Sequence, residues 1–163
     1  MTVRPWALVD AAALQAACGD PDICRLTTVP RHYTREAATA WIGHQHRRIG
    51  DGAGIVLAIV PSPVQQPVGM VGLFGLDEPG SAARLGYWIM RDHRRRGLAS
   101  EAVRLVADWA FAHLDIDVIH IDVEPGNEPS RRVAQAVGAT YQRQLTRKLT
   151  GNSVVLERFT LRR

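Results

Sequence analysis

The sequence contains few of the residues that support disulfide, zinc or nucleic-acid chemistry. Cys18 and Cys24 are its only cysteines, and no Cys/His spacing matches a zinc site, so we expect neither a disulfide framework nor a metal. Lys148 is the only lysine, and aromatic residues make up 6% of the chain. Nucleic-acid binders commonly spread Lys/Arg along one face and interleave aromatic side chains. We therefore expect no nucleic-acid partner, despite the formal charge of +4.

Long apolar segments and internal repeats are also missing. No apolar run approaches the ~20 residues that span a membrane, and Met1 to Pro5 lack the apolar core of a signal peptide. A hydrophobic fraction of 46% over 163 residues suffices for one buried core. We therefore expect a single domain over residues 1–163, located in the cytoplasm without membrane contact, as a monomer or a homodimer.

The spacing of apolar residues along the sequence changes from a strand period to a helix period at a basic turn. From Arg84 to Met90 the residues alternate with period two, as in a strand covered on both faces. After the turn, apolar residues recur with helical spacing as far as Leu114. The predicted buried face of this helix comprises Ala99, Ala102, Val103, Val106, Trp109 and Ala110.

The turn between strand and helix has the chemistry of an anion site. The first turn of a helix leaves N–H groups without backbone partners, and the helix dipole makes that end mildly positive. Gly97 lacks a Cβ and Ala99 is small, so a ligand can approach the main chain, while Arg94 to Arg96 add positive charge. The pattern therefore favours phosphate binding. The alternative is a solvated basic turn that only joins the two elements.

A second strand and a short helix follow. Val118 to Glu124 alternates and is rich in β-branched residues, so strand, helix and strand predict a right-handed parallel crossover. Asn127 is a good helix N-cap, and the helix from Ser130 to Val137 is expected to end at Gly138.

These segments together resemble the GNAT superfamily of acetyl-CoA-dependent N-acetyltransferases, in particular the ribosomal-protein-alanine acetyltransferase branch. The matching residues are Gly86-Tyr87-Trp88-Ile89, Arg94-x-x-Gly97-x-Ala99, and Asn127-x-x-Ser130-x-x-Val133 followed by Gly138. The resemblance implies that the basic turn binds the pyrophosphate of CoA and that the strand end pairs with the pantetheine arm. The implied donor-binding residues are Trp88, Ile89, Met90, Arg94, Arg95, Arg96, Gly97, Leu98, Ala99, Ser100, Asn127 and Ser130.

The rest of the chain predicts a mixed fold. We expect a helix that is capped by Asp10 and runs through Cys18, and a second that is capped by Thr34 and runs through Ile49, with Ala37, Ala40, Trp41 and His44 on one face. A loop is expected from Ile23 to Tyr33. Further strands are expected at Thr2–Trp6, Gly54–Val60, Val68–Leu76, Tyr141–Leu149 and Val154–Leu161, with turns at 77–80 and 150–153. The predicted class is α/β (α+β). It has a mostly antiparallel sheet of six or seven strands, about four helices and one central parallel β-α-β crossover, as the GNAT resemblance also implies.

Three residues are candidates for catalysis. Asp122 is the leading candidate base, on the side of the strand that it shares with His120 and Glu124. Glu124 is the second candidate, because it begins the turn into Asn127. The alternative is that these residues form a solvated or salt-bridged strand face. Many family members protonate the departing thiolate with a helix tyrosine, and Ala134 stands there by spacing. Ser130 or a water then becomes the candidate acid, unless Ser130 only satisfies the helix backbone.

The predicted reaction is direct transfer of an acetyl group from acetyl-CoA to a primary amine in a ternary complex. The amine is that of a protein N-terminus or of a small molecule, and the predicted acceptor-binding residues are His32, Tyr33 and Tyr87, with Trp41 and Trp88 as further candidates. Related sequences often carry a glutamate where this chain has Arg84, so their acceptor chemistry does not transfer directly. The alternative function is an acyl-CoA-binding sensor without turnover.

Overall fold

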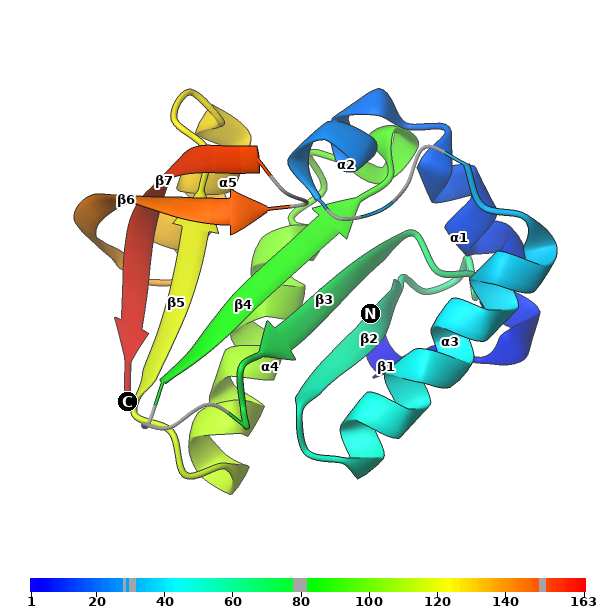
Figure 1. Ribbon diagram of the computed structural model, residues 1–163, viewed down its shortest axis with the longest axis horizontal. Helices are drawn as coiled ribbons and strands as arrows, with labels where there is room; N and C mark the ends of the chain where they lie inside the picture. Colours follow the sequence, from blue (N-terminus) through cyan, green and yellow to red (C-terminus); the bar gives the residue numbers. More distant parts are fainter. Residues whose placement is uncertain (28, 30–31, 78–81, 150–151) are drawn as a thin grey trace.

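A seven-stranded mixed sheet organises the chain. The computed structural model describes residues 1–27, 29, 32–77, 82–149 and 152–163. The order of the strands across the sheet is β1-β2-β3-β4-β5-β7-β6, and every neighbouring pair is antiparallel except β4 with β5 (Figure 1). The strands are β1 (Thr2–Pro5), β2 (Gly54–Val60), β3 (Gly69–Phe74), β4 (Ala82–Ile89), β5 (Val118–Val123), β6 (Thr140–Leu149) and β7 (Asn152–Arg162). The predicted fold class, with its single parallel crossover, is confirmed.

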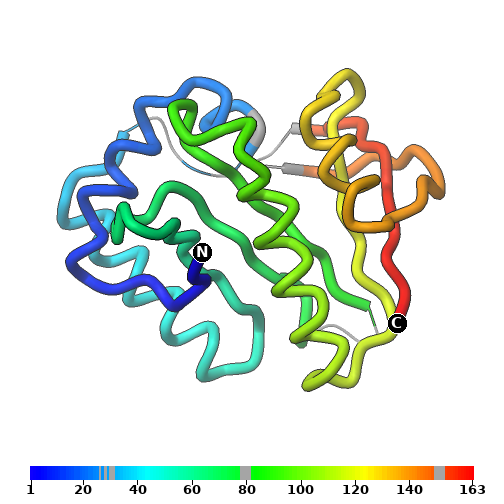
Figure 2. Tube along the Cα trace, turned by 180° about the vertical axis from the view of Figure 1, so that it is seen from behind, coloured from blue at the N-terminus to red at the C-terminus, as the bar shows by residue number. Residues whose placement is uncertain are grey.

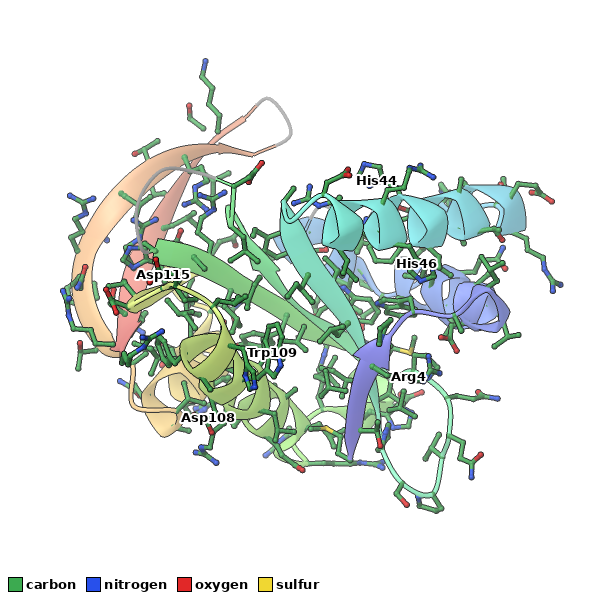
Figure 3. The ribbon with its side chains drawn as sticks, turned by 90° about the horizontal axis from the view of Figure 1, so that it is seen from below. Arg4, His44, His46, Asp108, Trp109 and Asp115 are labelled. Atoms are coloured by element: carbon green, nitrogen blue, oxygen red, sulfur yellow. The ribbon has the colours of Figure 1, made fainter. Side chains whose placement is uncertain are left out.

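Helices cover both faces of the sheet. They are α1 (Ala11–Cys18), α2 (Pro21–Leu26), α3 (Arg35–Gly50), α4 (Leu98–His113) and α5 (Glu128–Ala136), with short 3-10 turns at Leu8–Asp10 and Arg91–His93. Figure 3 shows α3 and α4 on opposite sides of the sheet, and Figure 2 shows α4 lying across the back of it. Among the described residues, no helix combines the length and the apolar character needed to cross a membrane.

Two apolar cores result, one on each face. The core beneath α4 and α5 contains Ile119, Ile121 and Val123 from β5, which are all buried, whereas His120 and Asp122 point to the opposite face. The predicted alternation of this strand is therefore confirmed. The core beneath α1 and α3 is built around Trp6. Its ring packs edge-on against that of Trp41, with 5.8 Å between the ring centroids, and its centroid lies 6.2 Å from that of Trp88.

Two predictions about helix faces were wrong. On α3 the buried residues are Ala38, Ile42 and Gln45, one position away from the predicted stripe. On α4, Trp109 is 42% exposed and stacks on His113 at 5.5 Å. On α4 the buried residues are Ala102, Val103, Val106, Ala107 and Ala110, so the buried stripe is centred away from Trp109.

The chain between α1 and α3 also differs from the prediction. Residues 23–26 belong to the helix α2, not to a loop, and Asp20 caps this helix by accepting a hydrogen bond from the Asp22 N–H at 3.0 Å. Asp10 does not cap α1 with its side chain; its carboxylate binds Arg4 and the Ala7 N–H instead. Parts of the predicted 23–33 loop and of the turns at 77–80 and 150–153 lie outside the described residues.

Candidate active site

The parallel strands β4 and β5 separate after a short shared ladder. Among the described residues, three pairs join them, the last being Arg84 with His120. From Leu85 to Ile89, β4 continues with β3 as its partner but without a strand on its β5 side. Figure 1 shows the two strands diverging toward their carboxyl ends. Main-chain groups on the inner edge of β4 are therefore available to an extended ligand.

The open end of this gap leads to the amino terminus of α4. Gly97 is the N-cap of this helix at φ 76°, and no side chain in the described part of the protein caps its first turn. Arg95 is also left-handed, at φ 61°, which is uncommon for a residue with a Cβ. A Cβ added to Gly97 would meet no atom of the described residues within 4 Å. The turn therefore presents unpartnered N–H groups beside open space, as an anion site requires.

The three arginines of the turn have different surroundings. Arg94 is held by protein groups: it binds Asp20 at 2.6 Å and Asp22 at 2.9 Å, and its Nε donates to the Ile89 carbonyl at 2.9 Å. The structure thus differs from the predicted mobile charge at this position, because two carboxylates already pair with the guanidinium. Arg95 and Arg96 are exposed beside Gly97.

Other donor-binding candidates fall into two groups. Trp88 and Ile89 are buried on opposite faces of the sheet, so only their main chain can meet a ligand in the gap. Leu98, Ala99, Ser100 and Met90 are partly buried around the turn.

Tyr87 and Ser130 meet across the gap between β4 and α5. The Tyr87 hydroxyl lies 2.8 Å from Ser130 Oγ, and the Asn127 side chain caps α5 by accepting from the Ser130 N–H at 3.2 Å. Burial raises the pKa of Tyr87 to about 12, against the opposing effect of the Ser130 hydrogen bond. Tyr87 therefore keeps its proton at neutral pH. Ala134, which stands where many family members have the helix tyrosine, is fully buried.

Asp122, the leading candidate base, lies in a network of ion pairs. Both of its oxygens accept hydrogen bonds from Arg158, at 2.8 and 2.9 Å, and Arg147 binds it at 2.8 Å. Burial alone would raise the pKa of this carboxyl, but the two arginines lower it below its usual value. A carboxylate with a depressed pKa that is bound by two guanidinium groups is a poor proton acceptor. The alternative of a salt-bridged strand face describes it better.

Glu124, the second candidate base, is also paired. Its carboxylate binds Arg25 of α2 at 2.9 Å. Since the other end of α2 is held by Arg94, this helix joins the end of β4 to the end of β5. Figure 1 shows α2 near the wide end of the gap.

Three of the predicted acceptor residues gather on the α3 side of the sheet. Tyr33, Trp41 and Trp88 line a cavity of about 160 Å³ together with Met70 and Phe74. His32 is exposed and does not line it. The cavity is mostly apolar, and its size suits one small side chain.

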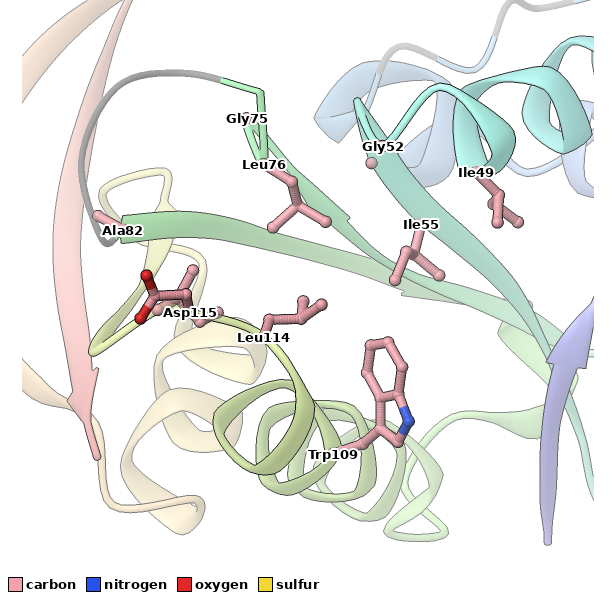
Figure 4. A pocket seen from close by; sticks show the side chains of 11 residues that line it. Ile49, Gly52, Ile55, Gly75, Leu76, Ala82, Trp109, Leu114 and Asp115 are labelled. Atoms are coloured by element: carbon pink, nitrogen blue, oxygen red, sulfur yellow. The ribbon is translucent and has the colours of Figure 1, made fainter.

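A larger cavity lies away from the candidate active site. It measures about 430 Å³ and sits near the carboxyl end of α4, where Trp109 and Leu114 face Ile55 and Leu76 (Figure 4). Asp115 is its one ionisable lining residue among the described ones. Its position beyond the far end of α4 from Gly97 separates it from the gap, so it contributes nothing to the chemistry considered above.

Several residues that shape the site were not predicted from the sequence. Asp20, Asp22 and Arg25 act through partners about 70 to 100 positions away along the chain. The pairing of Arg147 and Arg158 with Asp122 depends on strand register, which a sequence pattern does not give. The described residues contain no group of three or more His, Cys, Asp or Glu side chains arranged to hold a metal ion.

Known proteins resemble the chain in sequence and in fold. The family described as "Acetyltransferase (GNAT) domain" matches residues 1–140. The uncharacterized N-acetyltransferase p20 of Bacillus licheniformis is 26% identical over 137 residues, which cover 84% of this chain and 77% of p20.

Two solved structures extend the comparison. The ribosomal-protein-S5-alanine acetyltransferase of Vibrio fischeri superposes with a TM-score of 0.81 at 18% identity, over 98% of this chain and 91% of that one. The microcin C7 self-immunity acetyltransferase MccE, solved with acetyl-CoA and AMP, gives a TM-score of 0.86 at 18% identity, over 99% of this chain and 91% of MccE. The resemblance inferred from the motifs is thus confirmed, and the chain belongs to the GNAT family of acetyltransferases.

Proposed function

We propose that the protein transfers an acetyl group from acetyl-CoA to a primary amine by direct attack within a ternary complex. The observation that carries this proposal is the gap between β4 and β5, which runs to the uncapped amino terminus of α4. It offers main-chain hydrogen bonds to an extended arm and a phosphate site at its mouth. The two features are continuous and need no rearrangement of the strands.

The residues of the turn fit a CoA donor. Its pyrophosphate would accept hydrogen bonds from the backbone N–H groups of Leu98, Ala99 and Ser100. The exposed side chains of Arg95 and Arg96 add positive charge that can be directed at phosphate. Arg94 would support the turn indirectly, by fixing it to α2. When bound, acetyl-CoA supplies an acetyl group activated as a thioester; the protein's part is to hold it beside the acceptor.

Tyr87 and Ser130 form the best-supported route for a proton to the departing thiolate. In this route the Ser130 hydroxyl donates to the sulfur and is itself supplied by Tyr87, whose hydroxyl stands at 2.8 Å. The GNAT resemblance implies that Ser130 lies near the thioester sulfur, and Tyr87 stands within hydrogen-bond distance of Ser130. Tyr87 would thereby replace the helix tyrosine for which this chain has Ala134.

Neither candidate carboxylate is well suited to deprotonate the amine. Asp122 is engaged by two arginines and Glu124 by one. We therefore assign the deprotonation to water, which suffices for an amine whose pKa is already close to neutral. A peptide α-amine meets that condition, and the acetyltransferase of Vibrio fischeri named above acts, by its name, on a ribosomal-protein alanine.

A panel of amines tests this function. Thiol release from acetyl-CoA is measured with peptides beginning with Ala, Ser or Met, with lysine-containing peptides whose α-amine is blocked, and with small amines. Turnover of the α-amine peptides is expected, with the acetyl group found on the first residue by mass spectrometry. Tight CoA binding without turnover of any amine would instead support the alternative of an acyl-CoA sensor, which the buried Ala134 at the tyrosine position keeps open.

A further inference from the structure

The charge of this chain is unevenly distributed along the sequence. Eight of its 20 Lys/Arg residues but only one of its 16 Asp/Glu residues follow Glu128, so the first 128 residues carry twelve basic and fifteen acidic side chains. The excess of positive charge therefore belongs to α5, β6 and β7. These strands lie beside β5, on the side of the sheet away from β1 to β3 (Figure 1).

Strand register places five arginines on one face of this half of the sheet. Arg84 lies opposite His120, and Asp122 lies opposite Arg158, which in turn lies opposite Arg143 of β6. Paired residues point to the same side of a sheet, as do residues two apart along a strand. The cationic face, defined in this way, comprises Arg84, Arg143, Arg147, Arg158 and Arg162.

Negative charge on the cationic face is already neutralised. Asp122, with only 8% of its side chain exposed, is bound by two arginines, and Glu124 is paired with Arg25. His120, which donates to or accepts from Thr160 Oγ1 at 2.9 Å, has its pKa lowered by burial and then by the charges of Arg158, Arg143 and Arg162, against the opposite effect of Asp122. The lowered pKa disfavours the imidazolium form, so His120 adds no positive charge to this face at neutral pH. The exposed guanidinium groups of Arg143 and Arg162 can therefore act on a ligand that binds to this face.

The cationic face adjoins the candidate active site and is accessible. Asp122 belongs to the part of β5 that has separated from β4, so its two arginines stand beside the gap. Arg143 and Arg162 are exposed. Figure 1 shows no described helix in front of β5 and β7; only the far part of the β6–β7 hairpin crosses there.

We infer that the acceptor is a peptide whose residues just after the reactive amine are acidic, and that Arg143 and Arg162 of the cationic face select it. This inference rests on the proposed N-acetyltransferase function. In this arrangement the α-amine reaches the thioester from the α3 side and the following residues run along β5 and the hairpin, where their carboxylates meet guanidinium groups. The same face disfavours a polycationic amine, because like charges repel it.

Matched peptides test the inference. Each begins with Ala and differs only at its third to fifth residues, which are Asp/Glu, Asn/Gln or Lys. At about 50 mM salt we expect kcat/KM to be about tenfold higher for the acidic than for the amide peptide, with the Lys peptide lowest, and we expect the difference to shrink at about 500 mM because salt screens exposed charges.

Single variants identify the residues responsible. Arg143→Gln and Arg162→Gln are each expected to lower the acidic-over-amide ratio about two- to fivefold, the scale of one exposed charge pair. Arg132→Gln is the matched control: it removes the same charge from an exposed position on α5, and the ratio is expected to stay as in the parent. A labelled acidic peptide with its amine already acetylated gives a binding readout by fluorescence anisotropy that does not require turnover.

The outcomes separate the inference from the function. Equal use of the acidic and amide peptides, with transfer intact, overturns the inference and leaves the acetyltransferase proposal standing. Arg143-dependent binding of the acetylated acidic peptide without transfer to any amine would overturn the acetyltransferase proposal. Selection of acidic peptides by the cationic face would then still stand. Displacement of that peptide by an RNA oligonucleotide of equal charge at a much lower concentration would assign the face to nucleic acid and overturn the inference as well.

Discussion

At the scale of single residues, Gly97 combines a left-handed backbone with open space. Replacing it by Val forces a β-branched residue to φ 76° and places a side chain where a phosphate would approach the main chain. We expect acetyl-CoA binding, measured by calorimetry, to weaken at least about tenfold, or ~1.4 kcal/mol.

Gly138 provides the control for this change. It also has a left-handed backbone, at φ 88°, with no described atom within 4 Å of an added Cβ, but it lies after α5. Gly138→Val should lower stability to a similar extent, by thermal unfolding, and leave CoA affinity unchanged. Equal loss of affinity in the two variants would show that strain, and not obstruction of a phosphate, explains the result.

Tyr87 and Ser130 can be tested as a pair. If they pass one proton to the thiolate, Tyr87→Phe and Ser130→Ala should each lower kcat, by ~10²-fold for the serine as expected for the loss of a general acid, with little change in the KM for acetyl-CoA. The double variant should be about as slow as Ser130→Ala alone, because the two residues act in one chain. Fully additive losses would contradict the relay.

Asp122 should stabilise the fold and not set the rate. Its pKa is lower in the folded protein than in the unfolded chain, so its contribution to stability is full above about pH 4 and is lost as the pH falls through the folded value. Asp122→Asn should cost about 1–3 kcal/mol in denaturant unfolding at pH 7, below the ~3–5 kcal/mol typical of fully buried pairs because Arg147 is 30% exposed. The difference from the parent should shrink below pH 4.

The activity of the same variant distinguishes the two roles. At a temperature where it is folded, kcat/KM at pH 7 should remain within a few-fold of the parent. A loss of ~10²-fold with parent-like stability would restore Asp122 as the general base. Asp117→Asn, which removes a carboxylate at an exposed pair 3.9 Å from Arg163, is the control for a surface charge and should change neither quantity appreciably.

At the scale of elements, α2 shows how a short helix depends on distant partners. It has six residues, too few to be stable alone, and is held by its Asp20 cap, by Arg94 at one end and by Arg25 with Glu124 at the other. Arg94→Gln should therefore expose the amides of residues 23–26 to faster hydrogen exchange and cost about 2 kcal/mol of stability, the scale for hydrogen bonds between charged groups.

Arg91→Gln is the neighbouring control. Arg91 is 65% exposed and reaches Asp22 only at 3.9 Å, so its loss should leave exchange in α2 nearly unchanged. If Arg94→Gln left α2 protected while still weakening CoA binding, the originally predicted direct contact of Arg94 with phosphate would be favoured over its role as a tie to α2.

The same elements show what the sequence could and could not predict. Local patterns sufficed where neighbours along the chain decide the outcome: the alternation of β5, the Asn127 cap and the glycine turn before α4 were all predicted correctly. Predictions were wrong where distant contacts decide: α2 was expected to be a loop, and Trp109 was assigned to the core. The point at which β4 and β5 separate depends on how the whole sheet twists, so no local pattern reveals it.

At the scale of the whole molecule, the two substrates would approach from different directions. The phosphate turn lies at the amino end of α4, on one face of the sheet, and the cationic face lies on the other, with the gap between β4 and β5 connecting them. Proximity of two correctly placed reactants can contribute up to ~7–11 kcal/mol to lowering a barrier. An arrangement of this kind can therefore operate without a strong base, provided that the acceptor loses its proton easily.

That condition leads to a prediction about the acceptor's own pKa. A free α-amine with a pKa of ~7.7–8.0 is roughly a tenth neutral at pH 7, whereas a lysine amine near ~10.4 is neutral less than about once in a thousand. With water as the proton acceptor, kcat/KM for an α-amine peptide should rise about tenfold per pH unit and level off near pH 8. The corresponding peptide with a blocked α-amine and one lysine should be at least ~10²-fold slower at pH 7 and keep rising toward pH 10. Tyr87, with a pKa of about 12, does not titrate in this range, so it cannot produce either inflection. A plateau reached one unit or more below the pKa of the peptide amine, and preserved in Asp122→Asn, would mean that another protein group removes the proton, with Glu124 the first to replace by Gln.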